Sequence, residues 1–410
     1  MTSREDKRLL VCYVPGLDLR RVTPEYTPYV SQLMGSYPWT AISTLPSTEL
    51  FPTMITGVYP HEHGIWQVRL KPDANQLKQR GILDRVPDFL STTMQCLRNL
   101  FDKSYDLAAI PARRRRRFDL YRYKYERRMD SDEFVMRIGS FDTIFGILGE
   151  EGRYHFTKSF GTLDSLLSVL PSGGQRLEFL EMYALDLTQH WYLDREETMR
   201  SAYRTTDDFV RRLHENCQRK TVTLMLLVDH GQEPVVGIIP LAEKLRRSGI
   251  PEEEFSYFLE VAQARFWFHT DRARRRITDL LGTIDHTTLL GYKDLRRYHI
   301  EWEDDAYGEL YLMAEPGFIF FPHDFYQPLA NLFLGLTNRH QRSRVFSPRH
   351  RGCHGYLPGH PSEKGYAVLL DGGSTAIRPE IELIDIAPSV LDFLGIPKPK
   401  HMRGTSAFRG

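Results

Sequence analysis

The sequence predicts an α/β fold with a mostly parallel sheet, and two observations support this prediction. Two short runs of β-forming residues, 9–14 and 221–228, have the composition of buried strands in a parallel sheet. Each run is followed closely by a carboxylate, Asp18 after the first and Asp229 after the second. Because α/β folds bind their ligands at the carboxyl ends of parallel strands, both carboxylates are candidate site residues. For Asp18 the structural alternative is the N-cap of a helix or a turn.

The length and charge of the chain limit its class. At 410 residues it can form one large α/β domain with insertions, or two domains. The formal net charge of +1 provides no global field that would attract nucleic acid or a membrane surface. The charged N-terminus leads into no apolar signal region, no apolar stretch reaches the roughly 18 residues of a membrane helix, and the four cysteines lack paired spacing. We therefore expect a cytoplasmic protein with reduced thiols.

Further elements follow in an alternating order along the chain. A helix is expected near 27–35, because Gly35 ends it as glycine often does. A strand is expected to end just before Asp186, and the last helix is expected within 384–395. Strands at 264–269 and 309–314 with a helix at 271–281, and a strand at 366–370, complete the prediction.

Two segments differ in character from the rest and are predicted to be insertions in a single domain spanning 1–410. The segment 71–159 is basic and contains five consecutive arginines, Arg113 to Arg117. Arginine mixed with tyrosine can grip phosphates or stack on bases, but the nearby acids favour an exposed, charge-balanced helix instead. The segment 240–347 alternates strands with a helix, which predicts a small α/β cap.

A hydroxyl pair, Ser47 and Thr48, precedes the apolar run 50–55. Serine and threonine are favoured helix N-caps, and the N-terminus of a helix also attracts anions. A hydroxyl here is therefore either a plain cap or a nucleophile presented to a phosphate, and the local sequence leaves both open.

Two Asp-His pairs occur near predicted strand ends. Asp186 and His190 are four residues apart, so on a helix they share one face and can reach a single metal ion. Asp229 and His230 are adjacent, and Gly231 after them allows close approach of the backbone. Each pair alone is a weak signal, because solvated helices and turns contain such pairs incidentally.

Taken in order, these motifs resemble the alkaline phosphatase superfamily, specifically its type I phosphodiesterase/nucleotide pyrophosphatase branch. The resemblance covers most of the chain but not the arginine-rich insertion. It implies an alkaline-phosphatase-like three-layer sandwich with a mostly parallel central sheet, helices on both faces, and inserted cap segments. The motifs that carry it are V-P-G-L-Asp18, T-G-V-Y-P-H-E-H-G-I, Asp186-x-x-x-His190, Asp229-His230-Gly231, Cys353-His354-Gly355-Tyr356 and the ending I-E-L-I-D-I-A-P-S-V-L-D-F-L-G.

The resemblance also implies a catalytic centre with two divalent ions, usually Zn²⁺, with Mn²⁺ as the alternative. The nucleophile would lie between the ions, ten residues before Gly57, which gives Ser47, with Thr48 as the fallback. Two ions about 4 Å apart can activate a hydroxyl and stabilise the leaving oxygen without a general base. One ion would be held by Asp186, His190 and His354, and the other by Asp18, Asp229 and His230.

The sequence departs from the usual family pattern at two positions near these motifs. Leu19 replaces the glycine that usually follows the first aspartate, so we expect the backbone to approach Asp18 less closely. Leu50 stands where many members carry an asparagine that contacts a phosphate oxygen, and Arg20 or Arg21 could supply that contact instead. The choice between diester and monoester substrates therefore stays open.

The leading hypothesis is a metal-dependent phosphoric ester hydrolase acting on a small phosphorylated or nucleotide-like substrate. The alternatives are a phosphomonoesterase or phosphomutase on the same core, and a non-catalytic binding protein of the fold. A sulfatase is excluded because Glu49 and Phe51 occupy the positions of its signature. His63 is interpreted as a hydrogen-bonded turn residue, and neither membrane nor nucleic acid is expected as a partner; substrate-binding residues and oligomeric state are left open.

Overall fold

A computed structural model of the chain describes residues 7–67, 90, 93, 135–251, 253–302, 304–320, 350–372 and 375–408. The arginine run at 113–117, and most of the predicted basic insertion around it, lie outside the described residues. The chain divides into two compact units, which are described separately. The first contains Met1–Trp66, Tyr125–Pro234 and Leu357–Gly410, and the second contains Gln67–Lys124 and Val235–Tyr356.

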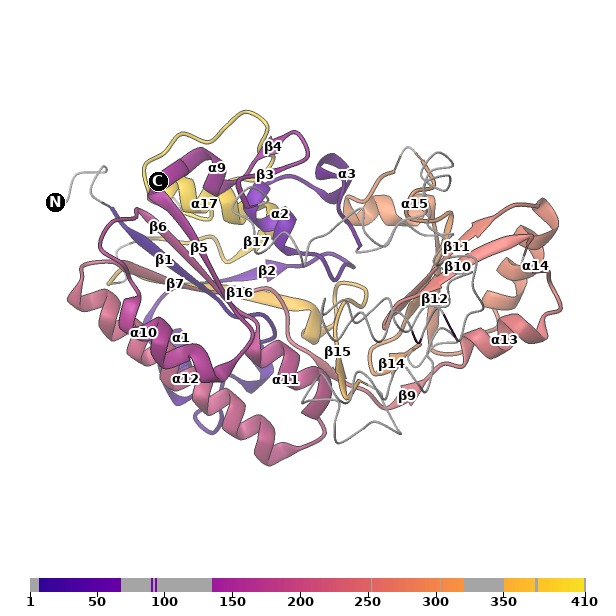
Figure 1. Cartoon of the computed structure of the whole chain (residues 1–410), viewed down its shortest axis with the longest axis horizontal. Coiled ribbons are helices and arrows are strands. Elements are labelled where there is room, and N and C mark those ends of the chain that lie inside the picture. Colours follow the sequence, from indigo (N-terminus) through magenta and orange to yellow (C-terminus); the bar gives the residue numbers. More distant parts are fainter. Residues whose placement is uncertain are drawn as a thin grey trace. The chain divides into compact units, whose positions relative to one another are not determined.

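A seven-stranded sheet in the order β17-β2-β16-β7-β1-β6-β5 forms the centre of the first unit (Figure 1). Every strand except β16 runs in the same direction, so the predicted mostly parallel sheet is confirmed. β16 is flanked by antiparallel partners on both sides, β2 and β7. The strands are β1 Leu9–Tyr13, β2 Trp39–Ser43, β5 Gly152–Thr157, β6 Leu177–Met182, β7 Thr223–Val228, β16 Lys364–Leu370 and β17 Glu380–Glu382.

Helices cover both faces of this sheet, as predicted (Figure 1). Alternate residues of a strand point to opposite faces, so β1 sends Leu10 and Cys12 into a core with α1, α10 and α12. Tyr13 and Phe179 instead contact Phe51 of α2 on the opposite face. The helices of this unit are α1 Pro28–Ser36, α2 Phe51–Thr56, α3 Pro60–His63, α9 Ile144–Leu148, α10 Leu163–Val169, α11 Ala184–Tyr192, α12 Glu196–Arg219 and α17 Ile386–Phe393.

The long helix α12 was not identified in the sequence, although its pattern explains it. Its apolar residues recur every three or four positions and form one buried stripe against the sheet. Its remaining face is strongly charged, which masks the apolar signal when the residues are averaged along the chain. The buried stripe includes Met199, Ala202, Tyr203, Phe209, Val210, Leu213 and Cys217.

The second unit has its own antiparallel sheet in the order β10-β11-β13-β12. The helix and the two strands predicted within 264–314 are confirmed as α14, β11 and β13, within one residue at each end. That this unit acts as a cap on a site stays a prediction. Its elements are β9 Gly237–Ile238, β10 Phe255–Leu259, β11 Gln263–Phe268, β12 Thr287–Gly291, β13 Leu310–Ala314, β14 Phe318–Ile319, β15 Gly352–Cys353, α13 Leu241–Arg247, α14 Asp271–Leu281 and α15 Tyr292–Leu295.

Two further observations concern the described residues as a whole. None of their helices combines the length and the hydrophobicity that crossing a bilayer requires. The described cysteines, Cys12, Cys217 and Cys353, are buried thiols that form no disulfide with one another.

Candidate active site

Asp18 lies beyond the carboxyl end of β1 and is almost completely buried, with 1% of its surface exposed. It is the N-cap of a short 3₁₀ turn, Leu19–Arg21, and its Oδ1 accepts the backbone N–H of Arg20 at 2.9 Å. Asp18 is therefore a helix N-cap, as the structural alternative predicted. A site role is compatible with it, because a carboxylate has lone pairs for several partners.

The guanidinium of Arg20 also binds Asp18. Arg20 Nη2 lies 2.6 Å from Oδ2, and Nε lies 3.0 and 3.1 Å from the two oxygens. The same side chain donates to Glu233 Oε2 at 2.6 Å and to the carbonyl of Gln232 at 2.7 Å. Burial alone would lower the pKa of Arg20, but the hydrogen bonds and charges of Asp18 and Glu233 outweigh burial and raise the pKa. The guanidinium of Arg20 therefore bridges the carboxylates of Asp18 and Glu233.

Asp186 and His190 lie on α11, which begins two residues after β6 ends. The predicted shared face is confirmed, because His190 Nε2 lies 3.4 Å from Asp186 Oδ2. Asp186 is fully buried, and the carboxamide of Gln232 donates to its Oδ1 and, at 3.1 Å, to its backbone carbonyl. A buried carboxylate held in this way has a fixed orientation, as hydrogen-bonding partners give to metal ligands.

Asp229 and His230 follow the last residue of β7, and both are buried. Tyr13 donates to Asp229 Oδ2 at 2.6 Å, and His230 Nε2 lies 3.3 Å from the same oxygen. His230 Nδ1 lies 2.8 Å from the carbonyl of Gly231, which places a proton on Nδ1, so Nε2 is the nitrogen that a metal ion would bind. This is the arrangement expected of an imidazole that binds a metal.

The charges around this pair act in opposite directions. Burial raises the pKa of Asp229, and the charge of His230 and the hydrogen bond from Tyr13 oppose this rise. Burial would lower the pKa of His230, but the charges of Asp229 and Asp186 raise it overall. The influence of Asp186 on both groups shows that the two Asp-His pairs share one electrostatic environment.

The structure brings Asp186 close to His230, which the prediction assigns to a different ion. A carboxylate oxygen of Asp186 and a ring nitrogen of His230 lie within 4.8 Å of each other. Which residues share each ion stays a prediction. His354 belongs to the second unit, where it is buried directly after β15, and its membership of the metal site also stays a prediction.

Ser47 lies in the loop before α2 and is 1% exposed. Its hydroxyl donates to the carbonyl of Trp66 at 2.5 Å and accepts the backbone N–H of Glu49 at 2.9 Å. The helix itself begins after Leu50, which offers no side-chain cap, so the plain N-cap alternative for Ser47 does not apply. Thr48 is exposed.

The interpretation of His63 as a turn residue agrees with its contacts. The backbone N–H of Ile65 donates to His63 Nδ1 at 3.1 Å, so the ring proton sits on Nε2, 3.0 Å from Thr53 Oγ1. Burial lowers the pKa of His63 to about 3, and the neutral ring joins α3 to α2.

Four residues around these groups were not singled out for these contacts in the sequence. Gln232 could have been noticed as a polar residue directly after Asp-His-Gly.

Glu181 on β6 is buried and accepts the Tyr154 hydroxyl at 2.6 Å. Burial raises the pKa of Glu181 to about 8; the Tyr154 hydrogen bond opposes the rise, and the charges of Asp229 and Asp186 add to it. Tyr13 and Tyr154 appear in the sequence only as ordinary strand residues.

Two glycines allow the backbone to approach the carboxylates. A Cβ at Gly231 would lie 2.4 Å from Asp18 Cγ. A Cβ at Gly16 would lie 3.1 Å from Asp186 Oδ1, and Gly16 also has a φ of +75° that side chains disfavour. The leucine at position 19 therefore does not prevent close approach to Asp18, which comes instead from Gly231.

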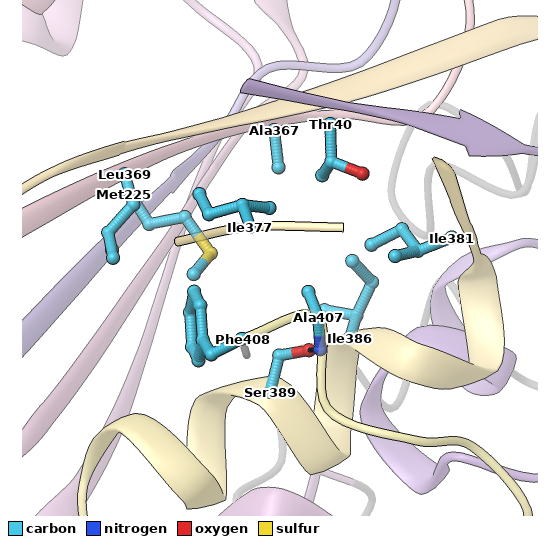
Figure 2. Close-up of a pocket in the computed structure, with 10 residues that line it drawn as sticks. All are labelled: Thr40, Met225, Ala367, Leu369, Ile377, Ile381, Ile386, Ser389, Ala407 and Phe408. Atoms are coloured by element: carbon cyan, nitrogen blue, oxygen red, sulfur yellow. Dashed lines mark hydrogen bonds between the residues drawn. The ribbon is translucent and has the colours of Figure 1, made fainter. Parts of the chain in front are cut away.

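A small apolar pocket lies elsewhere in the first unit (Figure 2). Met225, Ile386 and Phe408 point into it from β7, α17 and the C-terminal segment. None of the predicted site residues lines this pocket. It is a gap in the packing of α17 against the sheet, and its lining contains no carboxylate or histidine that could hold a metal ion.

The chain was compared with known families and structures. The family model of type I phosphodiesterase/nucleotide pyrophosphatase matches residues 18–327. No curated protein matches the sequence. Among solved structures, murine ectonucleotide pyrophosphatase/phosphodiesterase 5, as an inactive variant in complex with AMP, is 14% identical, covers 97% of both chains and has a TM-score of 0.63. The human protein is likewise 14% identical with a TM-score of 0.63, over 98% of this chain and 97% of its own.

The structural likeness supports the fold, and the family match carries the assignment. The three-layer α/β fold predicted from the sequence agrees with these neighbours over nearly the whole chain. The matched residues include Asp18, Ser47 and both Asp-His pairs. The chain therefore belongs to the type I phosphodiesterase/nucleotide pyrophosphatase family of the alkaline phosphatase superfamily, and it is a phosphoester hydrolase.

Proposed function

We propose that the chain hydrolyses a phosphodiester or pyrophosphate bond in a nucleotide-like substrate, with Ser47 as nucleophile and two divalent ions, Zn²⁺ or Mn²⁺. The observation that carries the proposal is the convergence of acids beyond three adjacent parallel strands. β1 lies between β6 and β7, and the segments after these strands carry Asp18, Asp186 and Asp229. This edge of the sheet is where α/β folds bind ligands.

The residues of the first unit fit divalent metal ions. Buried carboxylates and imidazoles are the donor set that Zn²⁺ prefers, and His230 offers Nε2 because its Nδ1 is held by Gly231. Asp186, His190 and His354 would hold one ion, and Asp18, Asp229 and His230 the other. Bound there, the ions would stabilise charge on the phosphoryl oxygens and lower the pKa of the serine hydroxyl.

Ser47 supplies the covalent step. Its hydroxyl must first leave the carbonyl of Trp66, to which it now donates, while the N–H of Glu49 still stabilises charge on Oγ. Attack forms the bond between Ser47 Oγ and phosphorus and breaks the ester or pyrophosphate bond, whose oxygen leaves with the first product. Water then cleaves the phosphoserine ester and restores Ser47.

The complex of the inactive murine neighbour with AMP supports a nucleotide-like substrate for this chain. The ester class is tested with bis-p-nitrophenyl phosphate and p-nitrophenyl phosphate in the presence of Zn²⁺ or Mn²⁺. The proposal expects faster turnover of the diester. Preference for the monoester would instead favour the phosphomonoesterase alternative.

The nucleophile is tested with Ser47→Ala, and Thr48→Ala is its matched control. Ser47→Ala is expected to lower kcat by about 10³-fold or more, whereas Thr48→Ala should keep kcat within a few fold. The reverse result would make Thr48 the nucleophile. If the purified protein binds neither metal and none restores activity, the metal-dependent mechanism is wrong.

A further inference from the structure

Arg20 occupies the face of Asp18 that a metal ion would need. Oδ1 of Asp18 accepts the backbone N–H of Arg20 and the guanidinium Nε, at 2.9 and 3.0 Å. Oδ2 accepts the guanidinium at 2.6 and 3.1 Å, and the backbone N–H of Gln232 lies 3.4 Å from it. A carboxylate offers about four lone-pair directions, so these donors leave little room for a cation.

The guanidinium is able to leave Asp18. The side chain of Asp18 is 2% exposed, whereas that of Arg20 is 36% exposed, so only the carboxylate is buried. Arg20 also has a second anchor, because its Nη1 donates to Glu233 Oε2 at 2.6 Å. When an ion takes Asp18, Arg20 keeps a carboxylate partner and avoids an unpaired charge in a partly buried position.

The residues predicted to hold the other ion, Asp186, His190 and His354 (the Asp186 group), have a different cationic neighbour. Asp186 forms an ion pair with His190, whose imidazole is itself a predicted ligand. An imidazole beside Asp186 can itself supply a ring nitrogen to an entering metal, so it adds a ligand at this group. The second ion is predicted to bind Asp18, Asp229 and His230 (the Asp18 group). A metal ion entering this group must displace a permanently charged guanidinium, or bind against its repulsion.

We infer that Arg20 is an internal cation that competes with the second metal ion for Asp18, so that the two ions bind in sequence and with unequal affinity. This inference rests on the proposed two-ion site, and it adds that Arg20 regulates the binding of the second ion. The ion at the Asp186 group binds first and more tightly. The ion at the Asp18 group binds only when Arg20 moves onto Glu233.

The inference is tested by titrating the metal-free full-length protein with Mn²⁺ in a calorimeter. The wild type is expected to bind one ion tightly and a second at least about tenfold more weakly. In Arg20→Gln the weaker Kd should fall about tenfold or more, and the tighter Kd should change less than twofold. Two equal sites in the wild type, or no second ion in Arg20→Gln, would overturn the inference.

Arg21→Gln is the matched control, because it removes the neighbouring charge without touching Asp18. Arg21 pairs with Glu196 at 3.8 Å and lies over the ring of Tyr26. An equal gain in second-ion affinity in both variants would mean that general charge, and not the contact with Asp18, sets the affinity. That result would also overturn the inference.

Glu233→Gln gives a second test in the opposite direction. Loss of the alternative anchor should hold Arg20 more firmly on Asp18, so the weaker Kd is expected to rise severalfold. An unchanged or lower Kd would contradict the displacement. Thermal melts of each metal-free variant verify that it is folded.

These titrations need no turnover, so they separate the inference from the proposed function. A protein that binds two unequal ions in the expected order but hydrolyses neither substrate would support the inference and defeat the proposed function. An active protein with two equal sites would do the reverse.

Discussion

The hydroxyl of Tyr13 donates a hydrogen bond of 2.6 Å to Oδ2 of Asp229. Tyr13 is the last residue of β1, and Asp229 follows the last residue of the adjacent parallel strand β7. Both residues are buried, so this bond forms in a region of low dielectric constant and ties the two strand ends together. Tyr13 is therefore a positioning residue for a predicted metal ligand.

Tyr13→Phe is expected to weaken metal binding. The change removes the donor that orients Asp229 and that opposes the rise in its pKa caused by burial. Loss of a group that hydrogen-bonds to a metal ligand typically lowers metal affinity by about 10-fold to 100-fold. Titration of the metal-free variant with Mn²⁺ measures the effect.

Tyr154→Phe is the matched control, because it removes the hydroxyl of a half-buried tyrosine in the same aromatic cluster. Its partner is Glu181, which is not a predicted ligand. Both variants are expected to lose about 1–2 kcal/mol of unfolding free energy, but only Tyr13→Phe should lose affinity by the larger factor. Equal affinities would contradict the positioning role of Tyr13.

Gly231→Ala is expected to disturb Asp18 with little change in the backbone. The added Cβ would lie 2.4 Å from Asp18 Cγ, and Asp18 is held in place by Arg20. We expect a loss of about 1–3 kcal/mol in unfolding free energy and weaker binding of the second metal ion. Gly173→Ala is the control, since nothing lies within 4 Å of its added Cβ. Chemical denaturation and metal titration of both variants check this; equal losses would show that the close approach is unimportant.

The central sheet could be predicted because its strands are short, apolar and followed by polar residues at their carboxyl ends. β1 and β7 illustrate this, and both lie within two residues of their predicted limits. The helix α12 could not be predicted in the same way, because its buried stripe is diluted by a highly charged outer face. The order of the strands in the sheet could not be predicted either. β16, near the C-terminal end of the chain, pairs with β2 near the N-terminal end and with β7 in the middle.

The sequence indicates candidate acids and histidines for the site, but it does not indicate the side chains that contact them. Asp186 and His190 share a helical face through their spacing alone. The contact between Arg20 and Asp18 could not be inferred, because an arginine two residues from an acid usually points to solvent. The bond from Ser47 to Trp66 spans nineteen residues of loop and helix, and no local pattern encodes it.

His63→Gln is expected to make the protein less sensitive to acid. Burial lowers the pKa of His63 from 6.5 to about 3, so its contribution to stability is complete above pH 6.5 and is lost as the pH falls through 3. At pH 4.5 the wild type should have lost about 2–3 kcal/mol through this residue. Glutamine can accept from Ile65 and donate to Thr53 without titrating.

Urea denaturation at pH 7 and pH 4.5 measures this difference. The gap between the wild type and His63→Gln should narrow or reverse at the lower pH. A constant gap at both pH values would show that folding does not lower the pKa of His63.

Glu181→Gln tests the buried carboxyl group beside the site. Burial raises the pKa of Glu181 from 4.5 to about 8. In the metal-free protein, the folded state therefore keeps its proton between these values while the unfolded chain loses it. The contribution to stability is complete below pH 4.5 and is lost as the pH rises through 8, by a total of about 5 kcal/mol.

Glutamine preserves an acceptor for the Tyr154 hydroxyl but cannot ionise. In EDTA, Glu181→Gln is therefore expected to gain stability relative to the wild type as the pH rises from 5 to 8, as measured by urea denaturation. Saturating Mn²⁺ should reduce this gain, because cations near Asp186 and Asp229, whose charges raise the pKa of Glu181, would offset those charges. A gain that is identical with and without metal would place the ions too far from Glu181 and contradict binding at these aspartates.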